Sequence, residues 1–249
     1  MAGHSKWSNI KHKKEKADAQ RASVFTKMGR EIAIAVREGG ADPSANSRLE
    51  ALISKAKSNN VPNENIERVI KKASGGDADK YERVFYEGYG AGGVAVIVET
   101  ATDNRNRTAA DMRHNFDKYG GNLGTTGCVS FMFSDKGVIV IEGQNVKDED
   151  KLMEDALECG GDDILFPPRG GDIDNDEVFF EIYTDPQTLN EVRRKLGELG
   201  YEMLSAEVEK IPSTRVAVND EEILLKFNKM LSVLEDNDDV QNVWHNLED

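Results

Sequence analysis

The sequence contains little cysteine and no long apolar run. Only two of its 249 residues are cysteines, and Cys128 and Cys159 lie in unrelated contexts, which argues against a disulfide framework or a multi-cysteine metal site. No apolar stretch approaches the ~18–20 residues that span a bilayer. Residues 1–16 are basic and polar and lack the apolar segment of a signal peptide. These absences predict a protein of the reducing cytoplasm that does not enter a membrane.

The sequence signatures of the common enzyme classes are also missing. There is no G-x-x-x-x-G-K-[ST] phosphate loop, and the glycine-rich stretch 88–93 does not lead into a helix as a dinucleotide fingerprint requires. The four histidines show no metal-binding spacing, and no serine lies in a G-x-S-x-G elbow. Carboxylates crowd into runs such as 148–150 and 236–239, which are typical of solvated loops and helix ends. We therefore expect a non-enzymatic protein with no catalytic residues, metal or cofactor.

Charge is distributed unevenly along the chain, whose formal net charge is −14. Residues 1–76 contain 15 Lys and Arg against 8 Asp and Glu, a net charge of +7. Residues 77–249 contain 17 Lys and Arg against 38 Asp and Glu, a net charge of −21. A basic module on an acidic body indicates a polyanion partner for one end of the chain. The alternative explanation of the lysines is an ordinary solvated helix surface.

The basic part of the chain has the periodicity of helices. Apolar residues recur at helical spacing between residues 25 and 36, and the glycines at 39–40 end that helix. Ser47 and Glu50 form a capping-box pattern that predicts the start of a second helix. Pro62 marks the first turn of a third. We expect a three-helix unit preceded by a basic N-terminal arm.

From residue 80 onward, strands alternate with helices. The first predicted series, in chain order, is strands 84–86 and 94–98, a helix at 108–119 and a strand at 128–133. The second series is strand 138–141, helix 149–159, strand 178–183, helix 186–199 and strand 201–206. Its order is interpreted as strand–helix–strand–strand–helix–strand, which is ferredoxin-like. The tail is predicted as strand 214–218, helix 220–235 and strand 240–244.

The first series and the tail are each too small to form a stable domain alone. The economical solution pairs them into one discontinuous domain with the second series inserted between them. The predicted class is therefore α+β with three domains. They are a basic helical N-terminal bundle (1–79), a discontinuous α/β ferredoxin-like domain (80–133 plus 209–249) and an inserted α/β ferredoxin-like domain (134–208).

The N-terminal arm is a candidate nucleic-acid contact. Its spaced lysines and arginines can neutralise phosphates and release counterions. Trp7 offers a plane for base stacking, although anchoring the arm to the helical domain explains it equally well. Lysine outnumbers arginine, which favours contact with the backbone over reading of bases. The candidate residues are Lys6, Trp7, Lys11, Lys13, Lys14, Lys16, Arg21, Lys27 and Arg30.

A second candidate lies between a predicted strand and a helix, at residues 100–108. Asp103, Asn104 or Asn106 can cap that helix, and a helix N-terminus favours anions. Arg105 and Arg107 could then hold phosphate or form salt bridges with an acidic neighbouring domain. Composition favours capping with interdomain salt bridges.

These motifs, taken together and in this order, closely resemble the YebC family, whose mitochondrial relatives are translational activators. The resemblance extends through essentially the whole chain. It is carried by Met-Ala-Gly-His-Ser-Lys-Trp at 1–7, Ile-Lys-His-Lys-Lys at 10–14, Phe-Thr-Lys at 25–27, Asn-Val-Pro-x-Glu-Asn-Ile-Glu at 60–67, Tyr-Glu-Gly-Tyr at 86–89, Thr-Asp-Asn-Arg-Asn-Arg-Thr at 102–108 and Gly-Gly-Asn-Leu-Gly at 120–124.

The resemblance implies three domains, no known catalytic activity and a nucleic-acid partner. Some members are described as probable transcriptional regulators that bind DNA, and others as ribosome-associated factors that aid translation of proline-rich stretches. Matching the motifs places nucleic-acid contacts on the arginines and lysines of the arm, with Arg105 and Arg107 as weaker candidates. One departure is Arg21-Ala22-Ser23, where many members have Arg-Gly-Lys, so position 23 lacks one possible phosphate contact.

The leading hypothesis is a cytoplasmic, DNA-binding transcriptional regulator whose basic domain contacts the backbone while the acidic domains contact a protein partner. The close alternative is a ribosome-bound translation factor that uses the same lysines on ribosomal RNA and relieves stalling on proline-rich stretches. A pure protein-interaction adaptor and an enzyme are more distant alternatives. Composition does not separate the first two, and it leaves the oligomeric state open.

Overall fold

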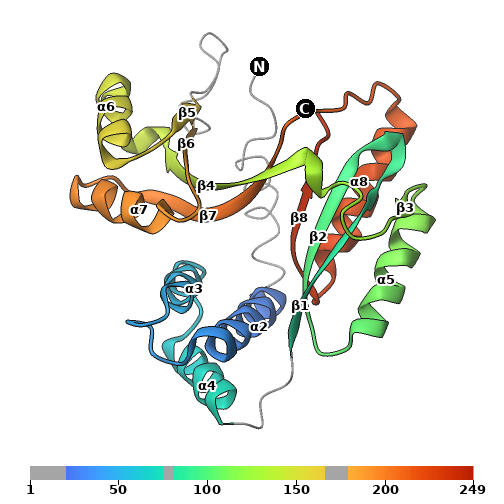
Figure 1. The fold of residues 1–249 in the computed structure, drawn as a ribbon, viewed down its shortest axis with the longest axis horizontal. Helices are drawn as coiled ribbons and strands as arrows, with labels where there is room; N and C mark the ends of the chain where they lie inside the picture. The colour runs from blue at the N-terminus through green and yellow to red at the C-terminus, as the bar shows by residue number, and fades with distance from the viewer. Residues whose placement is uncertain (1–20, 76–80, 166–178, 249) are drawn as a thin grey trace. The chain divides into compact units, whose positions relative to one another are not determined.

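The computed structural model describes residues 21–75, 81–165 and 179–248. Within them the chain forms two compact units, one containing residues 21–75, 81–131 and 214–247, the other residues 132–165 and 179–213 (Figure 1). The first unit holds a helical bundle and a discontinuous α/β domain, and the second is an inserted α/β domain. The predicted α+β class with three domains is confirmed. No helix in the described ranges is long and apolar enough to cross a membrane.

Three helices form the bundle: α2 (Arg21–Gly39), α3 (Ser47–Ser58) and α4 (Asn63–Ser74). Their apolar stripes share one core, which includes Ile32, Leu49, Ala56 and Ile66. Burying a large aliphatic side chain stabilises a fold by about 1.5–3 kcal/mol. The bundle is therefore held mainly by packing, because helices this short are marginal on their own. The three-helix prediction is confirmed.

The cap of α3 differs from the predicted one. Ser47 is already helical, and the N-cap is Asn46, whose side chain accepts the N–H of Leu49 at 3.1 Å. The same buried amide donates to the carbonyls of Ala35 and Gly40, both at 2.8 Å. Asn46 replaces the predicted serine cap because an amide has donors as well as an acceptor, and so joins the start of α3 to the end of α2.

The first sheet has the order β3-β1-β2-β8, with every neighbouring pair antiparallel. Its strands are β1 (Glu82–Tyr89), β2 (Ala95–Thr102), β3 (Asn122–Leu123) and β8 (Val240–His245). The last strand of the chain therefore pairs directly with β2, which makes this domain discontinuous in sequence. Its chain order is strand–strand–helix–strand, then helix–strand from the tail. The ferredoxin-like order predicted for this domain is therefore wrong, because its first two strands follow each other with no α-helix between them.

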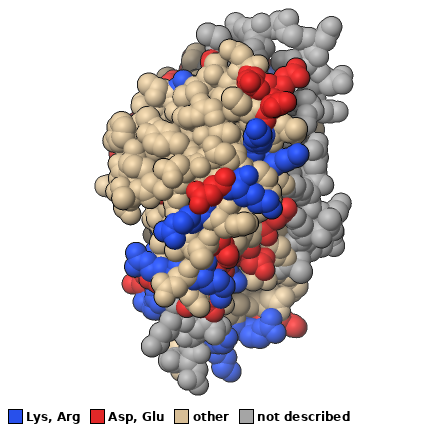
Figure 2. Space-filling view, turned by 90° about the vertical axis from the view of Figure 1, so that its right-hand side faces the viewer, with Lys and Arg blue, Asp and Glu red and all other residues tan. Residues whose placement is uncertain are grey.

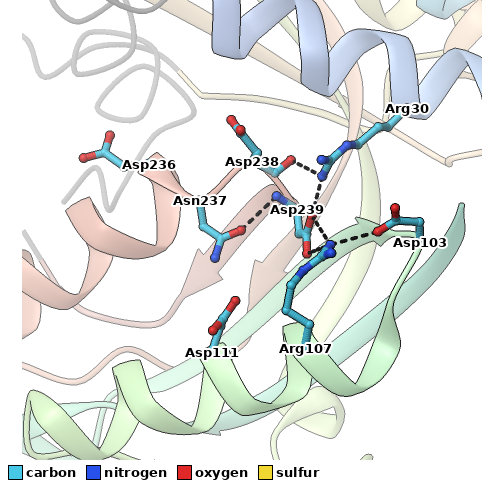
Figure 3. Close-up of a pocket in the computed structure, with 8 residues that line it drawn as sticks. All are labelled: Arg30, Asp103, Arg107, Asp111, Asp236, Asn237, Asp238 and Asp239. Carbon is cyan, nitrogen blue, oxygen red and sulfur yellow. Dashed lines mark hydrogen bonds and ion pairs between the residues drawn. The ribbon is translucent and has the colours of Figure 1, made fainter.

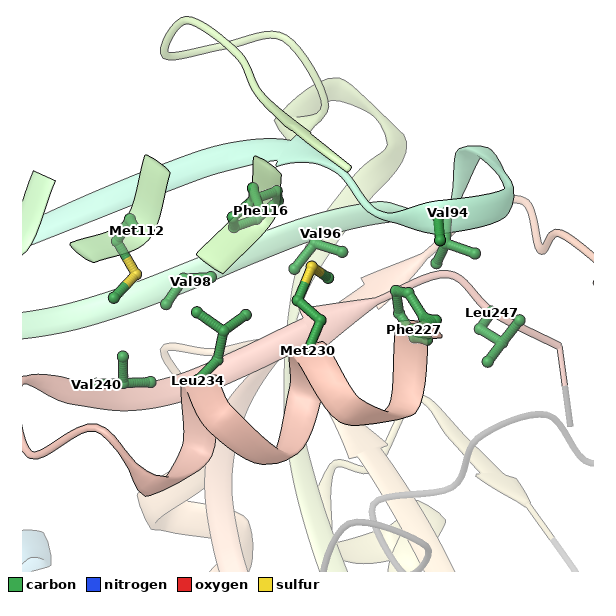
Figure 4. Packing of buried hydrophobic residues seen from close by; sticks show 11 residues of the cluster. Val94, Val96, Val98, Met112, Phe116, Phe227, Met230, Leu234, Val240 and Leu247 are labelled. Atoms are coloured by element: carbon green, nitrogen blue, oxygen red, sulfur yellow. The ribbon is translucent and has the colours of Figure 1, made fainter. Parts of the chain in front are cut away.

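Helices α5 (Arg105–Lys118) and α8 (Glu221–Asp236) supply the other half of this domain's core. Val96 and Val98 of β2 point toward them and are fully buried (Figure 4). Phe116 of α5 and Phe227 and Met230 of α8 meet these valines, also without exposed surface. Because α8 comes from the tail, the core closes only when the two separated segments are together.

The predicted strand at 128–133 is wrong for most of its length. The third strand is the two-residue β3, and residues 130–132 form a short 3-10 turn before the next strand begins at Phe133. A buried carboxylate replaces the strand partner: Glu87 accepts the N–H groups of Gly127, Val129 and Ser130 at 2.9–3.0 Å. Burial alone raises the pKa of Glu87, but these donors outweigh it and leave the pKa below its ordinary value.

Replacing Glu87 by glutamine should therefore lower the free energy of unfolding by about 1–3 kcal/mol, because an amide cannot accept all three N–H groups. Urea unfolding of the full chain measures this loss. The exposed Asp117→Asn change on α5 serves as a control and should stay within about 0.5 kcal/mol. Equal stability of the two variants would contradict this role of Glu87.

The inserted domain has the predicted order strand–helix–strand–strand–helix–strand. Its sheet has the order β5-β6-β4-β7, and all neighbouring strands are antiparallel. The two central strands, β4 and β6, are the first and third of this domain in chain order, as in a ferredoxin-like fold. Leu152, Phe180, Ile182 and Leu196 lie in its core. Its elements are β4 (Phe133–Glu142), α6 (Glu149–Cys159), β5 (Asp163–Leu165), β6 (Phe179–Thr184), α7 (Leu189–Glu198) and β7 (Met203–Pro212).

The predicted strand at 214–218 is also wrong. In this segment only Val216 forms a bridge, an isolated one to Leu247 outside the strands of either sheet. Val216 and Val218 instead pack on the core beside α8. The apolar residues alternate in this segment because one side of it is buried, although the segment does not join the sheet.

Candidate nucleic-acid interface

Six of the predicted nucleic-acid contacts lie outside the described residues: Lys6, Trp7, Lys11, Lys13, Lys14 and Lys16. Arg21 is the first residue of α2. The side chains of Lys27, Arg30, Arg105 and Arg107 are described. Three of these four have acidic or carbonyl partners in the same unit, so the structure gives them a defined environment.

Lys27 and Arg30 of α2 contact the turn between α8 and β8. We call residues 235–239, which contain four carboxylates, the acidic turn. Lys27 Nζ donates to the Glu235 carbonyl at 2.6 Å. Arg30 donates to the Asp238 carbonyl at 2.7 Å and forms a salt bridge with Asp239. The guanidinium of Arg30 also lies 5.3 Å from the ring centroid of Tyr81, a cation–π contact.

Asp239 is the centre of this junction (Figure 3). It is 5% exposed and joins Arg30 of the helical bundle to Arg107 of α5, whose Nη2 lies 3.0 Å from Asp239 Oδ2. Thr108 donates its hydroxyl to the same oxygen at 2.6 Å, and the Asp239 carbonyl accepts the N–H of Ala101 at 2.7 Å. Asp239 therefore joins the bundle and α5 through its carboxylate and β2 through its backbone carbonyl.

The electrostatics of the junction keep these groups charged. Burial alone raises the pKa of Asp239, but hydrogen bonds from Thr108, Arg107 and Arg30 outweigh it, so the pKa lies below its ordinary value. Hydrogen bonds to Asp239 and Asp103 raise the pKa of Arg107. At neutral pH the junction is a network of permanent ion pairs.

A cavity of about 400 Å³ opens at this junction. Its lining residues are Arg30, Asp103, Arg107, Asp111, Asp236, Asn237, Asp238 and Asp239 (Figure 3). Five carboxylates against two guanidinium groups make it a poor holder of phosphate. Across the described residues, no three His, Cys, Asp or Glu side chains are grouped to hold a metal ion.

In the loop before α5 the predicted helix cap is confirmed, whereas the prediction that its arginines form interdomain salt bridges is wrong for Arg107. Asn104 is the N-cap and accepts the N–H of Arg107 at 3.1 Å. Arg107 forms salt bridges with Asp103 and Asp239, both of which belong to its own α/β domain and not to a neighbouring one. Arg105 is exposed, and its carbonyl accepts the Tyr86 hydroxyl at 3.4 Å. Whether Arg105 or Arg107 also contacts nucleic acid stays a prediction.

Among the described residues on the face viewed from the α5 side, the basic side chains form no continuous surface (Figure 2). Lysine and arginine side chains are interleaved there with aspartate and glutamate. On α5 itself, exposed Arg105, Arg113 and Lys118 alternate with Asp117 and the nearby Asp103. Mixed signs of charge weaken long-range attraction of a polyanion to this face.

Sequence reasoning missed Asp239. The run 236–239 is typical of a solvated helix end, yet Asp239 is buried while Asp236 and Asp238 are exposed. The available signal was position: Asp239 immediately precedes Val240, the first residue of a buried strand. Its arginine and threonine partners are more than 130 residues away in sequence, so no local pattern identifies them.

Comparison with known proteins agrees with this architecture. Residues 5–76 match the model of the TACO1/YebC protein N-terminal domain, and residues 81–247 match that of the TACO1/YebC second and third domain. The chain is 56% identical to a "probable transcriptional regulatory protein" of Acetivibrio thermocellus, over 99% of this chain and 98% of the relative. It is 52% identical to a protein of the same name in Persephonella marina, over 100% and 96%.

A solved structure shares the fold. The crystal structure of a conserved hypothetical protein from Aquifex aeolicus aligns with a TM-score of 0.86 and 46% sequence identity, covering 98% of this chain and 97% of that one. The two family matches together span nearly the full length, from the basic arm to the last strand. The chain therefore belongs to the TACO1/YebC family, whose curated bacterial relatives bear the name of transcriptional regulators.

Proposed function

We propose that this protein is a non-enzymatic, cytoplasmic regulator of transcription that binds DNA through its basic N-terminal domain. The observation that carries the proposal is the concentration of cations before residue 31, eight Lys and Arg against two Asp and Glu, in a chain of net charge −14. The regulator names of its relatives support it. The contacts are assigned first to Lys6, Trp7, Lys11, Lys13, Lys14, Lys16 and Arg21, then to Lys27, Arg30, Arg105 and Arg107.

Binding is expected to depend on the backbone and to show little sequence preference. Lysines contact phosphates as point charges, whereas arginine-rich helices read bases. The acidic domains are assigned to a protein partner, because their negative charge repels nucleic acid. The second candidate function, translation on the ribosome, is favoured by the same lysine-rich composition, which suits the backbone of ribosomal RNA equally.

The salt dependence of affinity tests this proposal. If about five phosphates are neutralised, the logarithm of affinity for duplex DNA should fall with the logarithm of salt concentration with a slope of about −4.5. Fluorescence anisotropy with a labelled duplex, between about 50 and 200 mM salt, measures the slope. A flat response would refute an electrostatic contact. Co-sedimentation with ribosomes from the same lysate, without DNA retention, would favour the translation alternative.

A further inference from the structure

The basic residues at the start of α2 already face a polyanion within the molecule. Ser23, Lys27 and Arg30 are spaced at i, i+4 and i+7 and so share one face of the helix. The Ser23 hydroxyl donates to Asp238 Oδ1 at 2.8 Å, Lys27 to the Glu235 carbonyl, and Arg30 to Asp238 and Asp239. The whole face therefore lies on the acidic turn, residues 235–239.

The acidic turn offers what a phosphate backbone offers. Four of its five residues carry carboxylates, and its carbonyls accept hydrogen bonds from Lys27 and Arg30. Nucleic acid presents the same combination of closely spaced anionic oxygens to lysine and arginine. In sequence the face follows directly on the basic arm.

The acidic turn does not supply acceptors for all the hydrogen-bond donors of Arg30. Arg30 Nε is buried and donates to no acceptor in the described part of the chain. Buried N–H groups are usually hydrogen-bonded, so this one favours a second acceptor. Once the turn is displaced, a phosphate can accept from Nε and Nη at once, because its oxygens match the planar fork of a guanidinium.

We propose that the acidic turn is an internal competitor of nucleic acid for the Ser23–Lys27–Arg30 face of α2. The proposal rests on the proposed function of the basic domain. In the free protein the turn occupies the face and the arm alone attracts the polyanion. Bound nucleic acid displaces the exposed part of the turn and adds Lys27 and Arg30 to its contacts. The turn thereby weakens binding of short or weakly held strands.

Neutralising the exposed part of the turn tests the competition. The full chain with Asp236→Asn and Asp238→Asn keeps the backbone carbonyls and the buried Asp239. Its affinity for a short duplex DNA should rise about three- to tenfold at moderate salt, since two competing charges are removed. The matched control is Asp117→Asn with Glu222→Gln, which removes two exposed charges of the same unit away from α2. The affinity of this control for the same duplex should rise less than about twofold, because distant exposed charges are screened.

The hydrogen-exchange rate of a backbone amide in the turn provides a second measurement, which does not depend on long-range charge. The Asp239 amide donates to Asn237 Oδ1 at 2.8 Å, so displacement of the turn should accelerate its exchange when duplex DNA is added. Equal affinity gains in both double variants, with Asp239 exchange unchanged by DNA, would overturn the internal competition while the proposed function stands. If no form binds DNA or ribosomal RNA, the proposed function fails and the competition with it.

Discussion

Replacing Asp239 by alanine is expected to lower the free energy of unfolding by about 3–5 kcal/mol, the cost of removing one partner from a buried ion pair. The change leaves the nearly buried guanidinium of Arg30 without its anion and the Thr108 hydroxyl without its acceptor. It also removes the carboxylate that joins the helical bundle to α5, while the contacts of Ser23 and Lys27 with the acidic turn remain. Urea unfolding of the full chain measures the loss.

Two variants separate this effect from the general charge of the turn. Asp238→Asn removes a charge one residue away and should cost less than about 0.5 kcal/mol, because that side chain is exposed. Arg107→Ala should cost about 1 kcal/mol or less, because the Arg107 side chain is 47% exposed. If Asp239→Ala is as mild as either variant, the central position assigned to Asp239 is wrong.

The stability of the junction should also depend on pH. The folded-state pKa of Asp239 lies below its ordinary value. A lowered pKa means that the unfolded state binds the proton more tightly, so this contribution is present above the unfolded value of about 3.9 and is lost as pH falls through the folded value. Wild-type stability should therefore decline faster than that of Asp239→Asn below about pH 4, as measured by urea unfolding at a series of pH values.

Reversing the charge of three arm residues, Lys11, Lys13 and Lys14, to glutamate is expected to abolish most nucleic-acid binding. Each phosphate contact releases about 0.9 counterion, which at about 0.1 M salt is worth about eightfold in affinity. Losing three contacts lowers affinity by about 500-fold, and repulsion by the new carboxylates lowers it further. Anisotropy with duplex DNA and with ribosomal RNA measures both candidate partners.

The control must change net charge equally. Lys147, Lys151 and Lys229 are exposed and lie outside the basic domain, so their reversal to glutamate changes the charge by the same amount. The affinity of that variant for nucleic acid should fall no more than about tenfold, because it changes only the long-range electrostatic attraction. Equal losses in the two triple variants would show that overall charge, and not the arm, determines binding. Unchanged function in the arm variant would favour a protein-interaction adaptor.

Elements with strong local patterns were predictable. The helix over Glu149–Cys159 begins and ends as expected, since Asp148 supplies its cap and Gly160 adopts the left-handed conformation that ends it. Periods of 3.6 and 2 residues identified the bundle and most strands because each element buries one face. The short strand β3 and the segment 124–130 were not predictable. Their conformation depends on Glu87, which is about 40 residues away.

Gly88 illustrates the same limit at one residue. It stands in a strand pattern, where glycine is usually unfavourable. In the folded domain a β-carbon at this position would lie 2.5 Å from the Asn122 carbonyl and 2.9 Å from the Phe116 ring. The glycine is required by the close approach of β3 and α5. This close contact exists only in the tertiary structure, so the local sequence does not predict it.

The order of helices and strands, the basic start and the acidic remainder follow from the sequence alone, because they depend on local periodicity and on counts of charge. The environments of Lys27, Arg30 and Arg107 do not. Each of them has a partner in the tail, more than 130 residues away, which is brought near only when β8 pairs with β2. Whether a cation faces water or a carboxylate is decided by such long-range contacts, which no local pattern encodes.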